Sequence, residues 1–238
     1  MRRNHPQRRK EPAISGKRSK PIWIRLTGML IVTFFCFLTG TEGVYAEAST
    51  DQNEDTVLIA YFTVPEDVSL EETDAVSGAS ILRKDDQVYG NTEYIASLIA
   101  ARTGGALFAI ESAADYPREH APLLDAAAEE QNTDARPELT AVIDHPEAYD
   151  TIFIGYPIWW GDLPQPLYTF LETYDFSGKT IILFCVHGGS GLAGTMSTIS
   201  GLQPDANVLS QAYTVSRNSV ANVAQDDINT WIDSLELN

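Results

Sequence analysis

The chain has 238 residues, of which 33 are acidic and 16 are basic, and its formal net charge is −17. A surface of that sign repels nucleic acid and anionic membranes, so the composition excludes a nucleic-acid-binding protein. The length that follows residue 46 suits one domain with a sizeable core.

The N-terminus has the pattern of a secretory signal peptide. Residues 1–25 hold nine Lys or Arg and one acid, followed by the apolar run MLIVTFFCFL and the small-residue site VYA. This pattern predicts residues 1–46 as a signal peptide with cleavage after Ala46. An uncleaved anchor is the weaker alternative, because the apolar run is far shorter than the ~20 residues that span a bilayer. We therefore expect an exported protein, extracellular or in the cell envelope, with no membrane span after cleavage.

Cleavage changes both the charge and the cysteine content. It leaves 7 basic and 31 acidic residues, a net charge of −24, and Cys185 as the remaining cysteine. No internal disulfide is then possible. The histidines have no metal-ligand spacing among themselves or with Cys185, so no metal site is expected.

After a polar leader at residues 47–55, apolar runs of strand length alternate with helical patterns through a domain at 56–238. The strands are expected at 56–62, 106–110, 151–155 and 180–186, with a weaker fifth that begins at 206 and resumes at 212. Helical spacing of apolar residues occurs at 93–103, 123–134, 167–171 and 228–235. This alternation predicts an α/β fold with a parallel sheet covered on both faces. Ligands of such sheets bind beyond the carboxyl ends of the strands.

The connection from the first strand to the first helix is unusually long. Such connections usually take about 2 to 6 residues, whereas residues 64–89 form an acidic stretch. We interpret 64–89 as an insertion that contains a small hairpin at ILRKDDQVY.

Polar residues lie on both sides of this insertion. Thr63 follows the first strand, and Asn91 and Thr92 open the first helix, where free backbone N–H groups attract anions. These residues are able to hold a phosphate without Lys or Arg, although Asn-Thr before a helix is also an ordinary cap.

Two adjacent tryptophans occupy the loop after the third strand. Pro157 stiffens the turn that presents Trp159 and Trp160, and Gly161 adopts conformations barred to other residues. Indoles left in water are costly, so we expect one ring to pack under the following helix and the other to meet a flat apolar ligand.

The loop after the fourth strand is rich in glycine. Gly188 and Gly189 leave backbone groups bare for a planar ligand. His187 is either an edge contact to that ligand or a histidine bonded to its own turn. Cys185 is interpreted as an inert buried thiol rather than a nucleophile, because no basic partner is near it in sequence.

These segments, YFT, GNT, PIWWGDLPQP, YDFSGKTI and HGGSG, closely resemble the flavodoxin-like proteins of bacteria, and the resemblance extends from Val57 to Leu235. It implies a three-layer sandwich with a five-stranded parallel sheet in the order 2-1-3-4-5 and a bound FMN. The phosphate loop of the family matches Thr63, Gly90, Asn91 and Thr92. The two flavin-flanking loops match Pro157, Ile158, Trp159, Trp160 and Gly161, and Cys185, Val186, His187, Gly188 and Gly189.

The resemblance implies an electron carrier. With a net charge of −24 and no Lys or Arg in the loops matched to the cofactor, we expect a low-potential, monomeric carrier whose redox partners have basic docking faces. The main alternative is an NAD(P)H-dependent quinone or flavin reductase on the same fold. A cofactor-free binding module is a further alternative, and a hydrolase is disfavoured because Ser190 lacks a nucleophile-elbow context.

Overall fold

The computed structural model describes residues 57–66, 80–84 and 87–237. The chain divides into two units, residues 1–50 and 51–238, and the described residues belong to the second. The predicted signal peptide, the polar leader and the greater part of the insertion lie outside the described residues.

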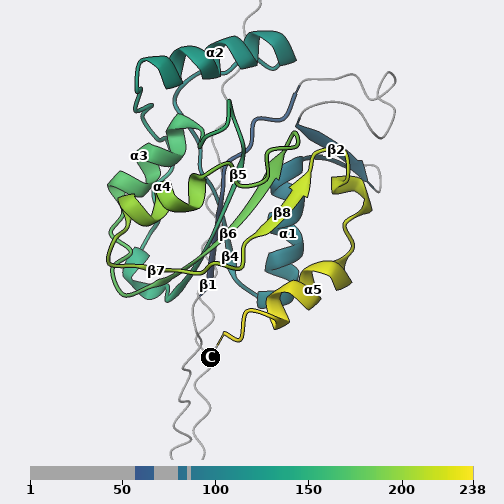
Figure 1. Cartoon of the computed structure of the whole chain (residues 1–238), viewed down its shortest axis with the longest axis vertical. Helices are drawn as coiled ribbons and strands as arrows, with labels where there is room; N and C mark the ends of the chain where they lie inside the picture. Colours follow the sequence, from purple (N-terminus) through teal and green to yellow (C-terminus); the bar gives the residue numbers. More distant parts are fainter. Residues whose placement is uncertain (1–56, 67–79, 85–86, 238) are drawn as a thin grey trace, which may run out of the picture. The chain divides into compact units, whose positions relative to one another are not determined.

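The core of this unit is a parallel sheet (Figure 1). Its strands are β1 (Val57–Tyr61), β4 (Ala106–Ala109), β5 (Thr151–Pro157), β6 (Thr180–His187), β7 (Asn207–Val208) and β8 (Tyr213–Ser216). The spatial order is β4-β1-β5-β6, and β7 and β8 both pair with β6. The predicted order 2-1-3-4-5 is therefore confirmed, with the fifth strand in two pieces.

Helices cover both faces of the sheet, as its apolar strands require. They are α1 (Asn91–Thr103), α2 (His120–Asn132), α3 (Gln165–Thr173), α4 (Thr195–Leu202) and α5 (Gln225–Asp233). Short 3₁₀ turns, η1 (Pro146–Ala148) and η2 (Val220–Asn222), lie in the connections.

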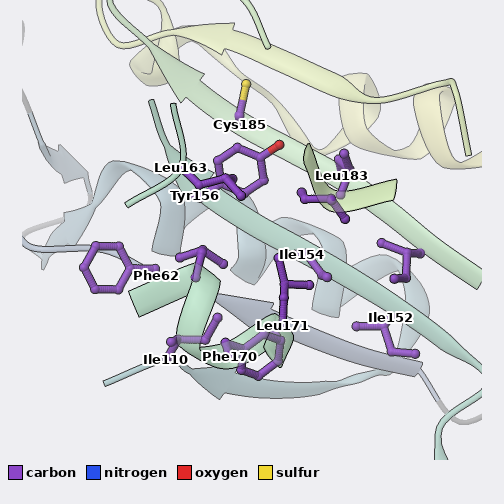
Figure 2. Packing of buried hydrophobic residues seen from close by; sticks show 14 of the residues in the cluster. Phe62, Ile110, Ile152, Ile154, Tyr156, Leu163, Phe170, Leu171, Leu183 and Cys185 are labelled. Carbon is purple, nitrogen blue, oxygen red and sulfur yellow. The ribbon is translucent and has the colours of Figure 1, made fainter. Parts of the chain in front are cut away.

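Two hydrophobic clusters show which helices belong to which face. Successive strand residues point to opposite faces: Ile152 and Ile154 of β5 lie in one cluster and Phe153 lies in the other. The first cluster takes side chains from α3 and α4, and Figure 2 shows Phe170 and Leu171 of α3 among the strand residues. The second takes side chains from α1 and α5. The expected three-layer sandwich is confirmed.

The hairpin predicted inside the insertion is present. Strands β2 (Ile81–Lys84) and β3 (Gln87–Gly90) pair antiparallel, and β3 runs directly into α1. The hairpin therefore returns the chain to the start of the first helix. Leu82 anchors it, because this side chain is buried in the cluster formed by α1 and α5.

Candidate functional site

A pocket lies at the carboxyl-terminal end of the sheet, where the sequence predicts the ligand. Its walls come from the segments that follow β1, β5, β6 and β8, and from the first turns of α1 and α2. The lining residues are Thr63, Val64, Ser80, Asn91, Thr92, His120, Leu123, Leu124, Pro157, Ile158, Trp159, Val186, His187, Gly188 and Arg217.

The pocket brings together nine of the predicted site residues from four separate segments of the sequence. These are Thr63, Asn91, Thr92, Pro157, Ile158, Trp159, Val186, His187 and Gly188. The other five predicted residues, Gly90, Trp160, Gly161, Cys185 and Gly189, are next to lining residues in sequence but are not part of the lining.

The polar end of the pocket is built where the insertion begins and ends. A Cβ on Gly90 would lie 2.2 Å from Oγ1 of Thr63, so the two segments are in close contact and any side chain at position 90 would force Thr63 to move. Asn91 and Thr92, which open α1, are both buried. The insertion therefore leaves the sheet after Thr63 and returns to the same point, which keeps the predicted phosphate loop together in space.

The backbone amides at the start of α1 differ in availability. The amide of Gly90 donates to Oε2 of Glu93 at 2.9 Å, and the amide of Asn91 donates to the carbonyl oxygen of Ser80 at 2.8 Å. The amides of Thr92 and Glu93 belong to the first turn, where a helix offers no backbone acceptor. Among the described residues, neither amide has an acceptor outside the helix, so both donors are available to an anion.

The tryptophan loop is a tight two-residue turn. Trp159 and Asp162 exchange two backbone hydrogen bonds, at 3.0 and 2.9 Å. The two residues between them have positive φ, 49° at Trp160 and 80° at Gly161. Two positive φ values in succession are the pattern of a type I′ turn.

This turn sends the two indoles in different directions. Trp159 lines the pocket, and its ring lies edge-on to Phe62 and Tyr116, with centroids 5.4 and 5.6 Å away. Trp160 is 58% exposed, and its Nε1–H donates to the carbonyl oxygen of Leu124 at 2.9 Å. Trp159 is therefore the ring available to a ligand in the pocket.

Tyr116, which packs edge-on against Trp159, is itself held by a hydrogen bond. Its hydroxyl donates to both carboxylate oxygens of Glu130, at 3.0 and 2.9 Å. Burial, together with the negative charge of Glu130, holds the pKa of Tyr116 above its ordinary value, so it stays a neutral donor. Burial also raises the pKa of Glu130. The pair ties α2 to the loop that carries Tyr116.

His187 is bonded to its own turn, one of the two roles that the sequence left open. Its ring Nδ1 accepts a hydrogen bond from the amide of Gly189 at 3.0 Å, and the residue also lines the pocket. Because Nδ1 is the acceptor, the neutral ring carries its proton on Nε2. His187 is thus bonded to its own turn and retains one N–H for a ligand.

Cys185 has the properties expected of an inert thiol. It is buried below the pocket, and its Sγ lies 3.8 Å from the carbonyl oxygen of Gly191. Burial raises the pKa of this thiol to about 12. The thiolate that nucleophilic chemistry needs is therefore scarce at neutral pH.

Comparison with known proteins identifies the family. The family model for flavodoxin matches residues 81–235. The chain belongs to the flavodoxin family. A search of curated protein sequences found no significant match.

Solved structures similar to this chain include bacterial flavoproteins. A candidate flavoprotein from Bacteroides eggerthii is 25% identical, with a TM-score of 0.57, over 77% of this chain and 99% of that one. A second from Bacteroides uniformis is 24% identical, with a TM-score of 0.56, over 75% and 97%. A flavoprotein from Lactobacillus acidophilus, solved in complex with FMN, is 17% identical, with a TM-score of 0.49, over 75% and 99%.

The pocket of this flavodoxin also contains residues that sequence reasoning missed. Ser80, His120, Leu123, Leu124 and Arg217 all line it. Two of them could have been found from their positions in the sequence. Arg217 directly follows the fifth strand, whose carboxyl end lies at the same edge of the sheet, and His120 begins the predicted acidic helix. Ser80 had none, because it lies inside the insertion.

The described residues contain no group of three His, Cys, Asp or Glu side chains placed to hold a metal ion. Likewise, no helix in the described part of this flavodoxin is long and apolar enough to cross a bilayer.

Proposed function

We propose that this flavodoxin binds FMN in the pocket at the carboxyl end of its sheet and acts as an electron-transfer protein. The observation that carries the proposal is the convergence of three segments, ending at Thr92, Trp159 and Gly188, on one cavity. One end of that cavity is polar and the other is aromatic and aliphatic. FMN has the same division, with a phosphate at one end and a flat isoalloxazine ring at the other.

The polar end suits the phosphate. The hydroxyl groups of Thr63 and Thr92 and the free amides of the first turn of α1 are the donors, and the positive end of the helix dipole favours an anion there. The close contact of Gly90 with Thr63 holds these donors in one place.

The other end suits the ring. Trp159 offers its indole, held in place by Phe62 and Tyr116, and Ile158 and Val186 add aliphatic surface. Nε2–H of His187 is directed by the bond at Nδ1 and is a donor for the polar edge of the ring. FMN itself supplies one- and two-electron redox chemistry, and the protein contributes orientation, exclusion of water and local charge.

We propose a low-potential carrier with basic partners, because the chain carries a formal net charge of −17 that disfavours further negative charge. Arg217 opposes this effect, because it places a positive charge in the lining of the pocket. The expectation of a site without basic residues was therefore incomplete, and we expect a potential less negative than surface charge alone would give.

The alternative function is an NAD(P)H-dependent reductase. The observation that favours it is a second cleft, which shares Thr63 and Val64 with the first pocket and opens beside Tyr61 and Tyr116. A reductase needs such a place for a second substrate next to the flavin.

One preparation tests both functions. Purified protein is scanned in the visible range and then denatured, and the supernatant is analysed for FMN. We expect a yellow protein that releases one FMN per chain. A colourless protein that takes up no added FMN would overturn the proposal. Anaerobic addition of NADPH then separates the two roles, because only a reductase bleaches the flavin without a partner protein.

We also propose that the protein is exported. Support comes from the basic N-terminal segment, the short apolar run and the small-residue site that ends at Ala46. N-terminal sequencing of protein recovered from the culture medium or cell envelope is expected to begin at Glu47. Recovery of intact chain from the cell interior alone would contradict it.

A further inference from the structure

We propose that Arg217 is an anion-recognition residue of the pocket, and that it makes the pocket select a phosphate monoester over a neutral flavin. This inference rests on the proposed function and extends it to the choice between FMN and riboflavin. The phosphate loop predicted from sequence contains no cation, so Arg217 adds a charge that the loop lacks.

The fold places Arg217 at the pocket. It follows β8 directly, and its amide donates to the carbonyl oxygen of His187 at 2.9 Å. That bond extends the pairing of β8 with β6, in which Ser216 lies opposite His187. Arg217 thus sits at the same edge of the sheet as Thr63 and Thr92 and lines one cavity with them.

Arg217 also differs from other cations of the domain in its partners. Arg102 pairs with Asp233, Arg136 pairs with Asp134 and Glu172, and Arg118 donates to the carbonyl oxygen of Pro65. Within the part of the chain that the structure describes, no carboxylate lies within ion-pair distance of the Arg217 guanidinium. In a protein of net charge −17, that leaves its charge available to an anionic ligand.

Two carboxylates near the polar end of the pocket disfavour an anion there, and the charge of Arg217 offsets their effect. The carboxylate of Glu93 accepts a hydrogen bond from the amide of Gly90. It therefore lies at the end of the helix that is expected to receive a phosphate. Glu66, at the beginning of the insertion, lies 3.1 Å from Nδ1 of His120. Both carboxylates repel a dianion, and a guanidinium in the same cavity offsets that repulsion and forms charge-assisted bonds to phosphate oxygens.

The test compares ligands that differ only in the phosphate. Full-length protein stripped of flavin is titrated with FMN and with riboflavin, and flavin fluorescence gives the two dissociation constants. The variants are Arg217→Gln, Arg217→Lys and Arg102→Gln, the last a matched control because Arg102 pairs with Asp233 on the surface.

We expect Arg217→Gln to weaken FMN binding about tenfold or more and to leave riboflavin binding unchanged. Arg217→Lys retains most of the FMN affinity, and Arg102→Gln matches the wild type. The salt dependence of FMN binding becomes shallower in Arg217→Gln. Equal losses for FMN and riboflavin, or no loss for either, would overturn the inference.

Inorganic phosphate provides a flavin-free measurement. We expect phosphate to raise the melting temperature of wild-type protein more than that of Arg217→Gln. If neither flavin binds but phosphate still distinguishes the two proteins, the FMN proposal fails and the anion site stands. If phosphate affects both proteins equally and the flavin selectivity is unchanged, the anion site fails on its own.

Discussion

Trp160 has a backbone conformation that tryptophan seldom adopts. Its φ of 49° lies in the left-handed region, which a large side chain enters at a cost. Asn at this position and Gly after it are the usual residues of a type I′ turn. Here the turn retains the glycine but carries an indole, whose N–H bonds to α2. The strain at Trp160 is therefore coupled to the position of the helix that covers the pocket.

Substitution of the two tryptophans is expected to separate their roles. Trp159→Leu should weaken FMN binding roughly tenfold, because an aromatic contact is worth about 0.5 to 1.5 kcal/mol beyond its buried area. It should also increase the fluorescence of any flavin that remains bound. The control is Trp160→Asn, which relieves the unfavourable φ and lies outside the lining; its FMN affinity should stay within about threefold of the wild type. A larger loss in the control would assign the ring contact to Trp160.

Cys185 is expected to be unreactive in the folded protein. Its burial and a pKa of about 12 leave almost no thiolate at pH 8. Iodoacetamide should therefore leave the Cys185 peptide unlabelled in native protein and label it after denaturation, as measured by mass spectrometry of the digest. Rapid labelling of native protein would show that the thiol is accessible.

Individual site residues were predictable where a strand ends in a polar or aromatic motif. His187 directly follows one predicted strand, Trp159 lies in the loop after another, and both line the pocket. The choice between Trp159 and Trp160 was not predictable, because it depends on a turn whose φ values the sequence does not reveal. Arg217 was missed because a lone Arg after a weak strand resembles an ordinary surface residue.

Strands β5 and β6 pair in parallel over seven positions. Gly155 of β5 lies directly opposite Phe184 of β6, and a Cβ on Gly155 would lie 2.0 Å from Cζ of that ring. Phe184 is fully buried, so the ring has no free space into which to move. The absent side chain at position 155 therefore allows the ring to fill the core under α1 and α5.

Gly155→Ala is expected to lower the free energy of unfolding by about 1 to 3 kcal/mol, the usual cost of overpacking. Gly201→Ala is the matched control. It lies in α4, where an added Cβ meets nothing within 4 Å, and alanine in a helix should stabilise by about 0.5 to 1 kcal/mol. Urea denaturation measures both. Adding Phe184→Leu to Gly155→Ala should recover part of the loss, and a double-mutant cycle without coupling would contradict the proposed clash.

At the scale of elements, apolar runs and helical spacing were sufficient for all the strands of the sheet and for four of the five helices. The fifth strand appeared weak in the sequence because it is divided, with residues 209–212 separating β7 from β8. Helix α4 was not predicted. Its sequence TMSTISGL combines β-branched residues, serines and a glycine, all poor helix formers, and it is stabilised by burial of Ile199 and Thr195 against the core.

At the scale of the whole molecule, the dominant property is a strong negative charge. Its net charge of −17, or −24 after the predicted cleavage, attracts cations over long range at low salt. The screening length falls from about 30 Å at 0.01 M salt to about 3 Å at 1 M. Encounter with charged partners should therefore depend on ionic strength.

We expect the FMN-loaded, reduced protein to transfer electrons to hexaammineruthenium(III) at a rate that falls at least about tenfold over this salt range. The rate with ferricyanide, an anionic acceptor, should rise instead. Stopped-flow absorbance of the flavin measures both. If the two acceptors showed the same salt dependence, the charge near the exposed flavin edge would differ from the charge of the whole molecule.

The placement of β1 affects how the chain is made. This first strand pairs with β4 on one side and β5 on the other, so it is an inner strand of the sheet. About 90 residues separate Tyr61 from Thr151, which at ribosomal speeds of roughly 5 to 20 residues per second is a delay of several seconds or more. During that interval VLIAY has no second neighbour, and an apolar segment with an open edge is prone to associate with other chains. We therefore expect the nascent chain to be most prone to association before β5 emerges.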